Sequence, residues 1–228
     1  MYGKFFVVVA AALAITGCSI SPPTLDTSAE AEMTFDGLYP VKNSRADKAW
    51  ARADVDLTQY SKIMLESVGA EYRPGGASGT TLKSRSSGGP YEISEANKAR
   101  FESIMREEFL KELGKSKHFA IVSEPGPDVL LVRVALLDVV SYVPPEPLAA
   151  RSDVFLSSVG EATLVLELRD SITDAILARA MDRRAAEKGG GSLSYSNPVT
   201  NAAEVSRLVR TWGRLLTERL DQYGGTTE

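Results

Sequence analysis

The residue types best suited to catalysis and metal binding are scarce in this chain of 228 residues. It contains one cysteine, Cys18, and one histidine, His118. A single cysteine allows neither an intrachain disulfide nor a cysteine-rich metal site, and one histidine is too few for a histidine-based zinc site. We therefore expect no metal site and no cofactor.

Cys18 follows a segment with the properties of a signal peptide. Lys4 supplies a positive charge, and the apolar run 5–15 comes next. The run is far shorter than the roughly 20 residues that span a bilayer, but it has the length of a signal-peptide hydrophobic region. We predict that residues 1–17 are a signal peptide. A buried N-terminal helix with an inert core cysteine is the alternative interpretation.

The end of this segment, Ile15-Thr16-Gly17-Cys18, resembles the bacterial lipobox. Small residues give the signal peptidase access to the backbone, and the thiol can form a thioether to a diacylglycerol. We therefore predict that Ile15, Thr16 and Gly17 are recognised by the peptidase and that Cys18 carries the lipid. Further acylation, for example with palmitate, would then hold the chain to a membrane.

The residues after the cysteine suggest where the protein lies. Ser19 rather than an aspartate follows Cys18. This resembles the enterobacterial sorting pattern for lipoproteins, and the resemblance implies the outer membrane, facing the periplasm. Residues 18–34 are polar and contain two consecutive prolines, so we interpret them as the lipidated cysteine and its tether. Residues 35–225 remain for a single domain.

Hydrophobic patterns predict the elements of that domain. Apolar or alternating runs indicate strands at 62–68, 119–122, 128–143, 160–169 and 175–187, and amphipathic patterns indicate helices at 94–113 and 202–223. The predicted fold is α+β, a small mostly antiparallel or mixed sheet of four to five strands with two amphipathic helices on one face.

Several local features carry more specific expectations. Asn201 with Glu204 resembles a capping box for the last helix. Arg133 and Asp138 have opposite parity in their strand, so they should point to opposite faces. The run 181–187 is unusually charged for a strand, and we expect it to reach the edge of the sheet.

Other catalytic arrangements find little support. A Ser-His-Asp triad would have to use His118. His118 follows the end of a predicted helix, and we expect its exposed imidazole to interact with the last carbonyl groups of that helix instead. Glu161 and Glu167 are candidates for paired carboxylates, although solvated strand faces carry such residues routinely. Asp182-Arg183-Arg184 with Glu187 would suit a contact surface for an acidic or polar partner, or local ion pairs at a solvated strand end, and we favour ion pairs. We predict no catalytic residues and no enzyme.

Blocks along the chain resemble a bacterial lipoprotein family. The blocks that match its order of motifs are Phe35-Asp36-Gly37-Leu38, Ala49-Trp50, Asp56-Leu57 with 60–65, 125–130 with 133–136, and Asp170-Ser171 with 177–180. The family is catalogued as domain-of-unknown-function family 3313. The resemblance implies an envelope lipoprotein with an α+β domain and carries over no catalytic residues.

These observations support a non-enzymatic binding or assembly module of the bacterial envelope, with another envelope protein as partner. A carrier of a lipid or small hydrophobic ligand is one alternative, and an undetected hydrolase is another. The net charge of −4 argues against nucleic acid as a partner.

Overall fold

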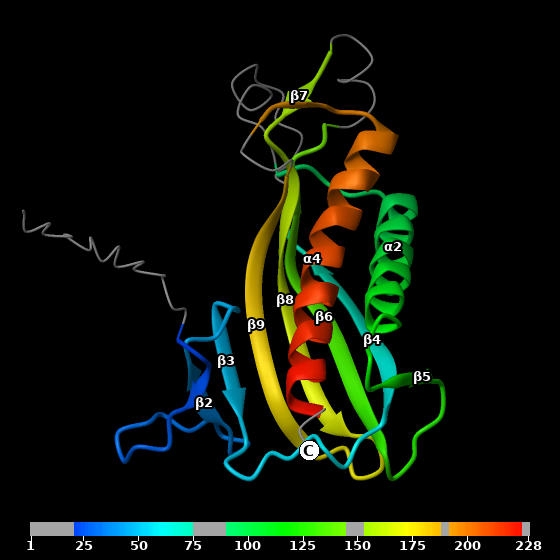
Figure 1. Cartoon of the computed structure of the whole chain (residues 1–228). Coiled ribbons are helices and arrows are strands. Elements are labelled where there is room, and N and C mark those ends of the chain that lie inside the picture. The colour runs from blue at the N-terminus through cyan, green and yellow to red at the C-terminus, as the bar shows by residue number, and fades with distance from the viewer. Residues whose placement is uncertain (1–20, 75–89, 145–152, 188–191, 225–228) are drawn as a thin grey trace, which may run out of the picture.

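A computed structural model describes residues 21–74, 90–144, 153–187 and 192–224 of the chain. Its elements form two layers, a large mixed sheet and a pair of helices lying side by side over one face of it (Figure 1). The predicted signal peptide 1–17 and the predicted lipidation site Cys18 lie outside the described residues. No helix within the described ranges is long and apolar enough to cross a membrane.

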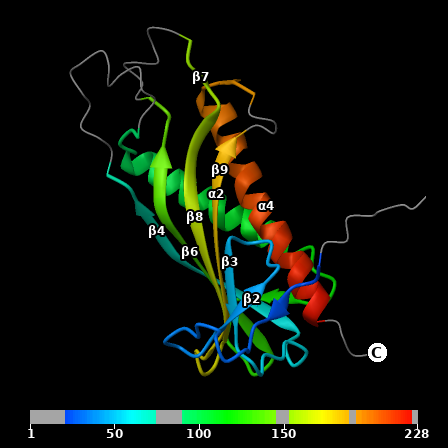
Figure 2. The ribbon, with the colours of Figure 1, turned by 90° about the vertical axis from the view of Figure 1, so that its left-hand side faces the viewer.

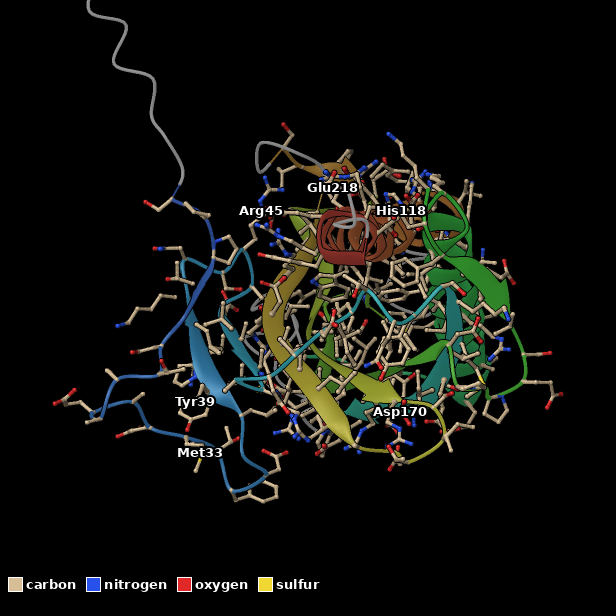
Figure 3. All side chains as sticks on the ribbon, turned by 60° about the horizontal axis from the view of Figure 1, so that its bottom comes forward. Met33, Tyr39, Arg45, His118, Asp170 and Glu218 are labelled. Atoms are coloured by element: carbon tan, nitrogen blue, oxygen red, sulfur yellow. The ribbon has the colours of Figure 1, made fainter. Side chains whose placement is uncertain are left out.

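The long strands of the sheet are those that the sequence predicts. β6 (Val129–Ser141) pairs with β4 (Lys62–Tyr72) in parallel and with β8 (Ser158–Asp170) in antiparallel orientation. β9 (Ile176–Glu187) returns beside β8 as the second arm of a hairpin. At the turn between these two strands, the Asp170 carboxylate accepts hydrogen bonds from the backbone N–H groups of residues 172 and 173. Figure 3 labels Asp170 at this end of the sheet.

The sheet is larger than the four to five strands predicted from the sequence, and that prediction is wrong. Among the described residues, eight strands follow the order β1-β2-β3-β9-β8-β6-β4-β5, and two more form a separate ribbon. β5 (Ala120–Val122) is the short strand predicted at 119–122. The strands beyond the prediction are β1 (Thr24–Leu25), β2 (Tyr39–Lys42), β3 (Lys48–Ala51), β7 (Phe155–Leu156) and β10 (Ser194–Tyr195). Strands of two to four residues are too short to show a periodic pattern. β1 also lies within the segment 18–34 that we interpret as a tether.

The charged end of β9 does lie at an edge. β3 pairs with β9 over residues 178–181, so Met181, the first residue of the predicted run, still has two neighbouring strands. Among the described residues, 182–187 have β8 as their single neighbouring strand. The preceding, less charged part of β9 is an interior strand. Charge therefore appears where β9 loses its second neighbour, which discourages pairing with other chains.

A β-bulge overturns the prediction that Arg133 and Asp138 point to opposite faces. Arg133 lies opposite Glu167 in the register, and Asp138 contacts Arg183, which lies opposite Thr163. Glu167 and Thr163 share a face of β8, so Arg133 and Asp138 share that face as well. The cause is the positive φ of 53° at Asp138, within the register shift between Leu137 and Val140.

The first helix agrees with its prediction. α2 (Glu95–Leu113) begins after Ser94, whose side chain accepts from the backbone N–H of Asn97. The helix ends at Gly114 and buries Met105, Phe109 and Leu113 against the sheet.

The last helix starts four residues earlier than predicted. α4 (Pro198–Gly224) is capped by Asn197, whose carboxamide oxygen accepts from the backbone N–H groups of Val199 and Thr200. The predicted capping box at Asn201 and Glu204 is wrong. Proline at the first helical position has no N–H to satisfy, and its fixed φ already suits a helix.

The two helices approach closely through a glycine. A Cβ added at Gly213 of α4 would lie 2.8 Å from the Glu112 Cβ of α2. Nearby, the Thr217 hydroxyl donates to the Glu112 carbonyl at 3.1 Å. In the view of Figure 2, α4 runs along one side of the curved sheet and α2 passes behind its strands. The buried side chains of both helices and the sheet residues Leu130, Val132, Val134 and Leu136 form one core.

Candidate functional site

A cavity of about 690 Å³ opens at the end of the core where both helices begin. We call it the end cavity. The first turns of α2 and α4, the end of β6 and the start of β8 surround it, at the upper end of Figure 1. The isolated bridge between Tyr91 and Ser141 fixes the entry to α2 against the end of β6. Its apolar walls include Phe101, Ile104, Val139, Val159, Val205 and Leu208.

Small residues on the sheet create this space. Facing the helices, β8 carries Ala162 at the cavity, whereas Leu164 and Leu166 occupy the next positions on the same face. Ala186 lines the same end from β9. Gly160 lets β8 approach β6, because a Cβ there would lie 2.2 Å from the Val140 carbonyl oxygen. The helices therefore meet a full core at one end and an open one at the other.

The rim of the end cavity is polar and carries one cation, Arg100, and two carboxylates, Glu92 and Glu161. The Arg100 side chain is exposed and forms no ion pair with any described residue. The N-terminal ends of α2 and α4, with their caps Ser94 and Asn197, also line the cavity and carry partial positive charge. Among the acidic lining residues, Glu161 is paired with an arginine at 2.5 Å, and Glu92 is exposed.

A second apolar space of about 380 Å³ lies beside the other half of α4. We call it the alanine groove, because its floor consists of Ala178 and Ala180 of β9 and Ala49 and Ala51 of β3. One wall is α4, with Trp212, Leu216 and Leu220, and the other is formed by β1 and β2, with Leu25 and Val41. The Arg45 guanidinium and the Glu218 carboxylate join the two walls at 3.2 Å (Figure 3).

Asp182 closes the inner end of the alanine groove. Its side chain is only 6% exposed, and it accepts a hydrogen bond of 2.7 Å from the Trp212 indole N–H. The Arg184 guanidinium binds the same carboxylate. This buried carboxylate is thereby paired and fixes the position of α4 on β9.

The face of the sheet away from the helices is charged. The Arg179 guanidinium binds Asp36 at 2.5 Å and Glu167 at 2.8 Å, and Arg169 binds Glu167 at 2.8 Å. Asp174 extends this network, because it binds both Arg169 and Arg133 at 3.2 Å. Burial opposes ionisation of Glu167, but hydrogen bonds from Arg169 and Arg179 outweigh burial and lower its pKa.

A second charged group lies further along the same face. Arg183 binds Glu161 at 2.5 Å and Asp138 at 2.8 Å, and Arg73 also binds Asp138. The hydrogen bond from Arg73 is the main cause of the lowered pKa of Asp138. These pairs satisfy the carboxylates locally and leave no free acid–base pair among them.

The residues singled out in the sequence do not converge on one site. Ile15, Thr16, Gly17 and Cys18 lie outside the described residues, and His118 is exposed in the turn after α2 (Figure 3). Glu161 and Glu167 are each held by their own arginines. Within the described residues, no group of histidine, cysteine, aspartate and glutamate side chains could hold a metal ion.

Sequence reasoning misses the cavity residues because each resembles an ordinary core residue. Val205 and Leu208 belong to the apolar stripe of α4, and Phe101 and Ile104 to that of α2. The available signal is the small pair Gly160 and Ala162 at the start of an otherwise leucine-rich strand face. That signal becomes meaningful only when both helix starts are placed over it.

Solved structures with a similar fold have low sequence identity to this chain. A PelC dodecamer from Paraburkholderia phytofirmans is 11% identical, covering 73% of this chain and 96% of that chain with a TM-score of 0.34. Protein XCC0632 from Xanthomonas campestris is 10% identical, covering 77% of this chain and 91% of that chain with a TM-score of 0.44. At TM-scores below 0.5, these likenesses carry no functional argument.

Sequence comparison gives a clearer result. No curated protein matches the chain. A family described as "Protein of unknown function (DUF3313)" matches residues 27–216, which agrees with the resemblance noted from the sequence. The chain therefore belongs to this family of proteins of unknown function.

Proposed function

We propose that this protein is a membrane-anchored, non-enzymatic binding module of the bacterial envelope, and that it binds an amphipathic molecule in the end cavity. The observation that carries the proposal is a space of about 690 Å³ with apolar walls and a polar rim that includes Arg100 and the first turns of two helices. Such dimensions and lining are typical of sites for small ligands, which fall in the range of about 300–1,000 Å³.

The apolar body of the ligand would lie between the helices and the sheet. Phe101 and Ile104 of α2 face Val205 and Leu208 of α4 across this space, above the small sheet residue Ala162. Apolar surface of this kind favours an acyl or similar hydrocarbon group over water. A flat partner surface would leave the space unfilled, so the cavity favours a small molecule over the envelope protein expected from the sequence.

The head of the ligand would be acidic. Arg100 supplies a cation at the rim, and the positive ends of α2 and α4 point to the same region. An anionic group such as a carboxylate or phosphate would complement both. Of the two carboxylates that line the cavity, Glu161 is bound by Arg183, and the charge of the exposed Glu92 is screened by solvent.

The anchor is also a proposal. The lipobox pattern supports cleavage before Cys18 and lipidation of its thiol, and Ser19 supports placement at the outer membrane facing the periplasm. The binding domain would then lie beside a source of amphipathic molecules.

A binding titration of the chain from residue 21 tests the proposed ligand class. The probe is a fluorescent fatty acid, cis-parinaric acid. Ala202 of α4 lines the end cavity, and Ala202→Trp fills it, whereas neighbouring Ala203 is exposed. We expect Ala202→Trp to weaken binding about tenfold or more and Ala203→Trp to leave it unchanged.

The acidic head is tested in the same titration with Arg100→Gln. We expect roughly fivefold weaker binding of the fatty acid and unchanged binding of the corresponding fatty alcohol. Equal affinity of all variants for the fatty acid would refute the proposed site. Loss of binding to both probes in Arg100→Gln would refute the assigned role of its charge.

A further inference from the structure

The alanine groove is a part of the sheet that the helices leave open. α2 packs over β4, and α4 packs over β8 and β9. On the helix side, β3, β2 and β1 continue the sheet beyond α4. Across these strands the register places Ala51 beside Ala178, and Val41 beside Leu25. The result is a continuous apolar strip that is recessed where its side chains are alanines.

The size of the groove selects a thin occupant. Its volume is about 380 Å³. A methylene group is similar in size to a water molecule, whose share of liquid volume is about 30 Å³, so the groove holds roughly a dozen methylenes. That is most of one acyl chain and far less than a helix with its side chains, which has a diameter of about 10 Å.

The sequence places a source of acyl chains next to this groove. Pro23 lines the groove, and Leu25 follows it in β1, which is hydrogen-bonded into the sheet. Cys18 is five residues before Pro23. Five extended residues span at most about 17 Å, so a lipid on Cys18 is tethered within reach of the groove.

We propose that the alanine groove holds one acyl chain of the protein's own lipidated Cys18. The inference rests on the proposed lipidation and is independent of the ligand of the end cavity. When the chain lies in the groove, Ala49, Ala178 and Leu216 replace the bilayer as its surroundings. Because the tether is short, this binding competes directly with insertion of the same chain into the membrane.

Binding of one acyl chain in the groove would weaken the attachment of the protein to the membrane. A lipoprotein with several inserted chains leaves a membrane slowly, and each withdrawn chain weakens its hold. The groove would give the withdrawn chain an apolar environment inside the protein. We therefore infer that the domain alternates between fuller and weaker membrane attachment by moving one chain between bilayer and groove.

Photo-crosslinking of the full chain in living bacteria tests the inference. A benzoylphenylalanine replaces Leu216, which lines the groove, or Arg214, which is exposed on the same helix. A second pair uses Ala46, which lines the groove from the turn between β2 and β3, and the exposed Ala53 as its control. After irradiation, the products are separated by size, digested, and examined by mass spectrometry.

The expected product is a monomer in which the peptide that bears the photo-crosslinker is joined to an acylated peptide that begins at Cys18. It should form from Leu216 and Ala46 at least about tenfold more than from Arg214 and Ala53, and it should vanish in Cys18→Ala. An acylated Cys18 peptide without this preference would overturn the inference and leave the anchor intact. Links to free phospholipid, to another protein or only within dimers would overturn it too. An unacylated Cys18 would overturn the anchor and the inference together.

Discussion

The hydrogen bond between the Trp212 indole and the Asp182 carboxylate joins α4 to the end of β9. Both side chains are buried, so removing one partner leaves the other without compensation. We expect Asp182→Ala to lower the free energy of unfolding by about 2–4 kcal/mol, measured by chemical denaturation. The control is Asp54→Ala, which removes an exposed pair with Arg52 and should change stability by less than about 0.5 kcal/mol.

The charged face predicts how stability depends on pH. The folded-state pKa of Glu167 is below its ordinary value of 4.5, because Arg169 and Arg179 outweigh burial. The stabilisation is therefore complete above about pH 4.5 and is lost as pH falls through the lowered pKa. We expect Glu167→Gln to flatten the acid limb of a plot of unfolding free energy against pH. Glu124→Gln, an exposed control, should leave it unchanged, and an equal effect of both would contradict this assignment.

At the scale of elements, the closest helix contact depends on Gly213. Alanine normally favours a helix over glycine by about 1 kcal/mol. Here a Cβ would lie 2.8 Å from the Glu112 Cβ and 3.1 Å from its Cγ. We expect Gly213→Ala to destabilise the protein by about 1–3 kcal/mol in thermal or chemical unfolding.

The matched comparison for this prediction is the exposed position Ala203 on the same helix. There Ala203→Gly should cost about 1 kcal/mol through helix propensity alone. If alanine were preferred over glycine at both positions, the close approach of α2 and α4 would not be a structural requirement.

The elements also show how far the sequence could predict the fold. The long strands and α2 carry complete periodic patterns, and their ranges agree closely with prediction. β1, β2 and β3 are set by pairing with one another and with β9, far along the chain, so their short segments carry no pattern of their own. The start of α4 is hard to place because Asn197-Pro198 resembles a loop as strongly as it resembles a cap followed by a first helical residue.

The same limit applies to the two apolar spaces. Small residues at Gly160, Ala162, Ala178 and Ala180 are visible in the sequence, but helix packing decides which of them face an opening. Likewise, only the bulge at Asp138 reveals that Arg133 and Asp138 share a face. The sites emerge from placement rather than from residue type.

For the whole molecule, the two sides of the sheet divide their roles. The end cavity and the alanine groove lie along opposite halves of α4, on the helix side, and the ion-pair networks lie on the other side. A single helix therefore borders both apolar spaces. Ligand binding in the end cavity would be coupled to membrane attachment only through a shift of α4. The buried hydrogen bond from Trp212 of α4 to Asp182 resists such a shift.

Membrane attachment is the first prediction at this scale. In cells, the full chain should fractionate with membranes, and Cys18→Ala should shift it to the soluble fraction, because each lost acyl chain removes about 0.8 kcal/mol per methylene. A serine substitution at the exposed control position Ala53 should have no effect. Unchanged membrane association of Cys18→Ala would contradict the anchor.

Native mass spectrometry of the protein purified from the bacterial envelope tests the central claim most directly. We predict that the wild-type chain and Ala203→Trp carry a small acidic amphipathic molecule, identifiable by its mass after release, and that Ala202→Trp does not. A wild-type chain without such a molecule, or an Ala202→Trp variant that retains it, would contradict the assignment of the end cavity as a ligand site.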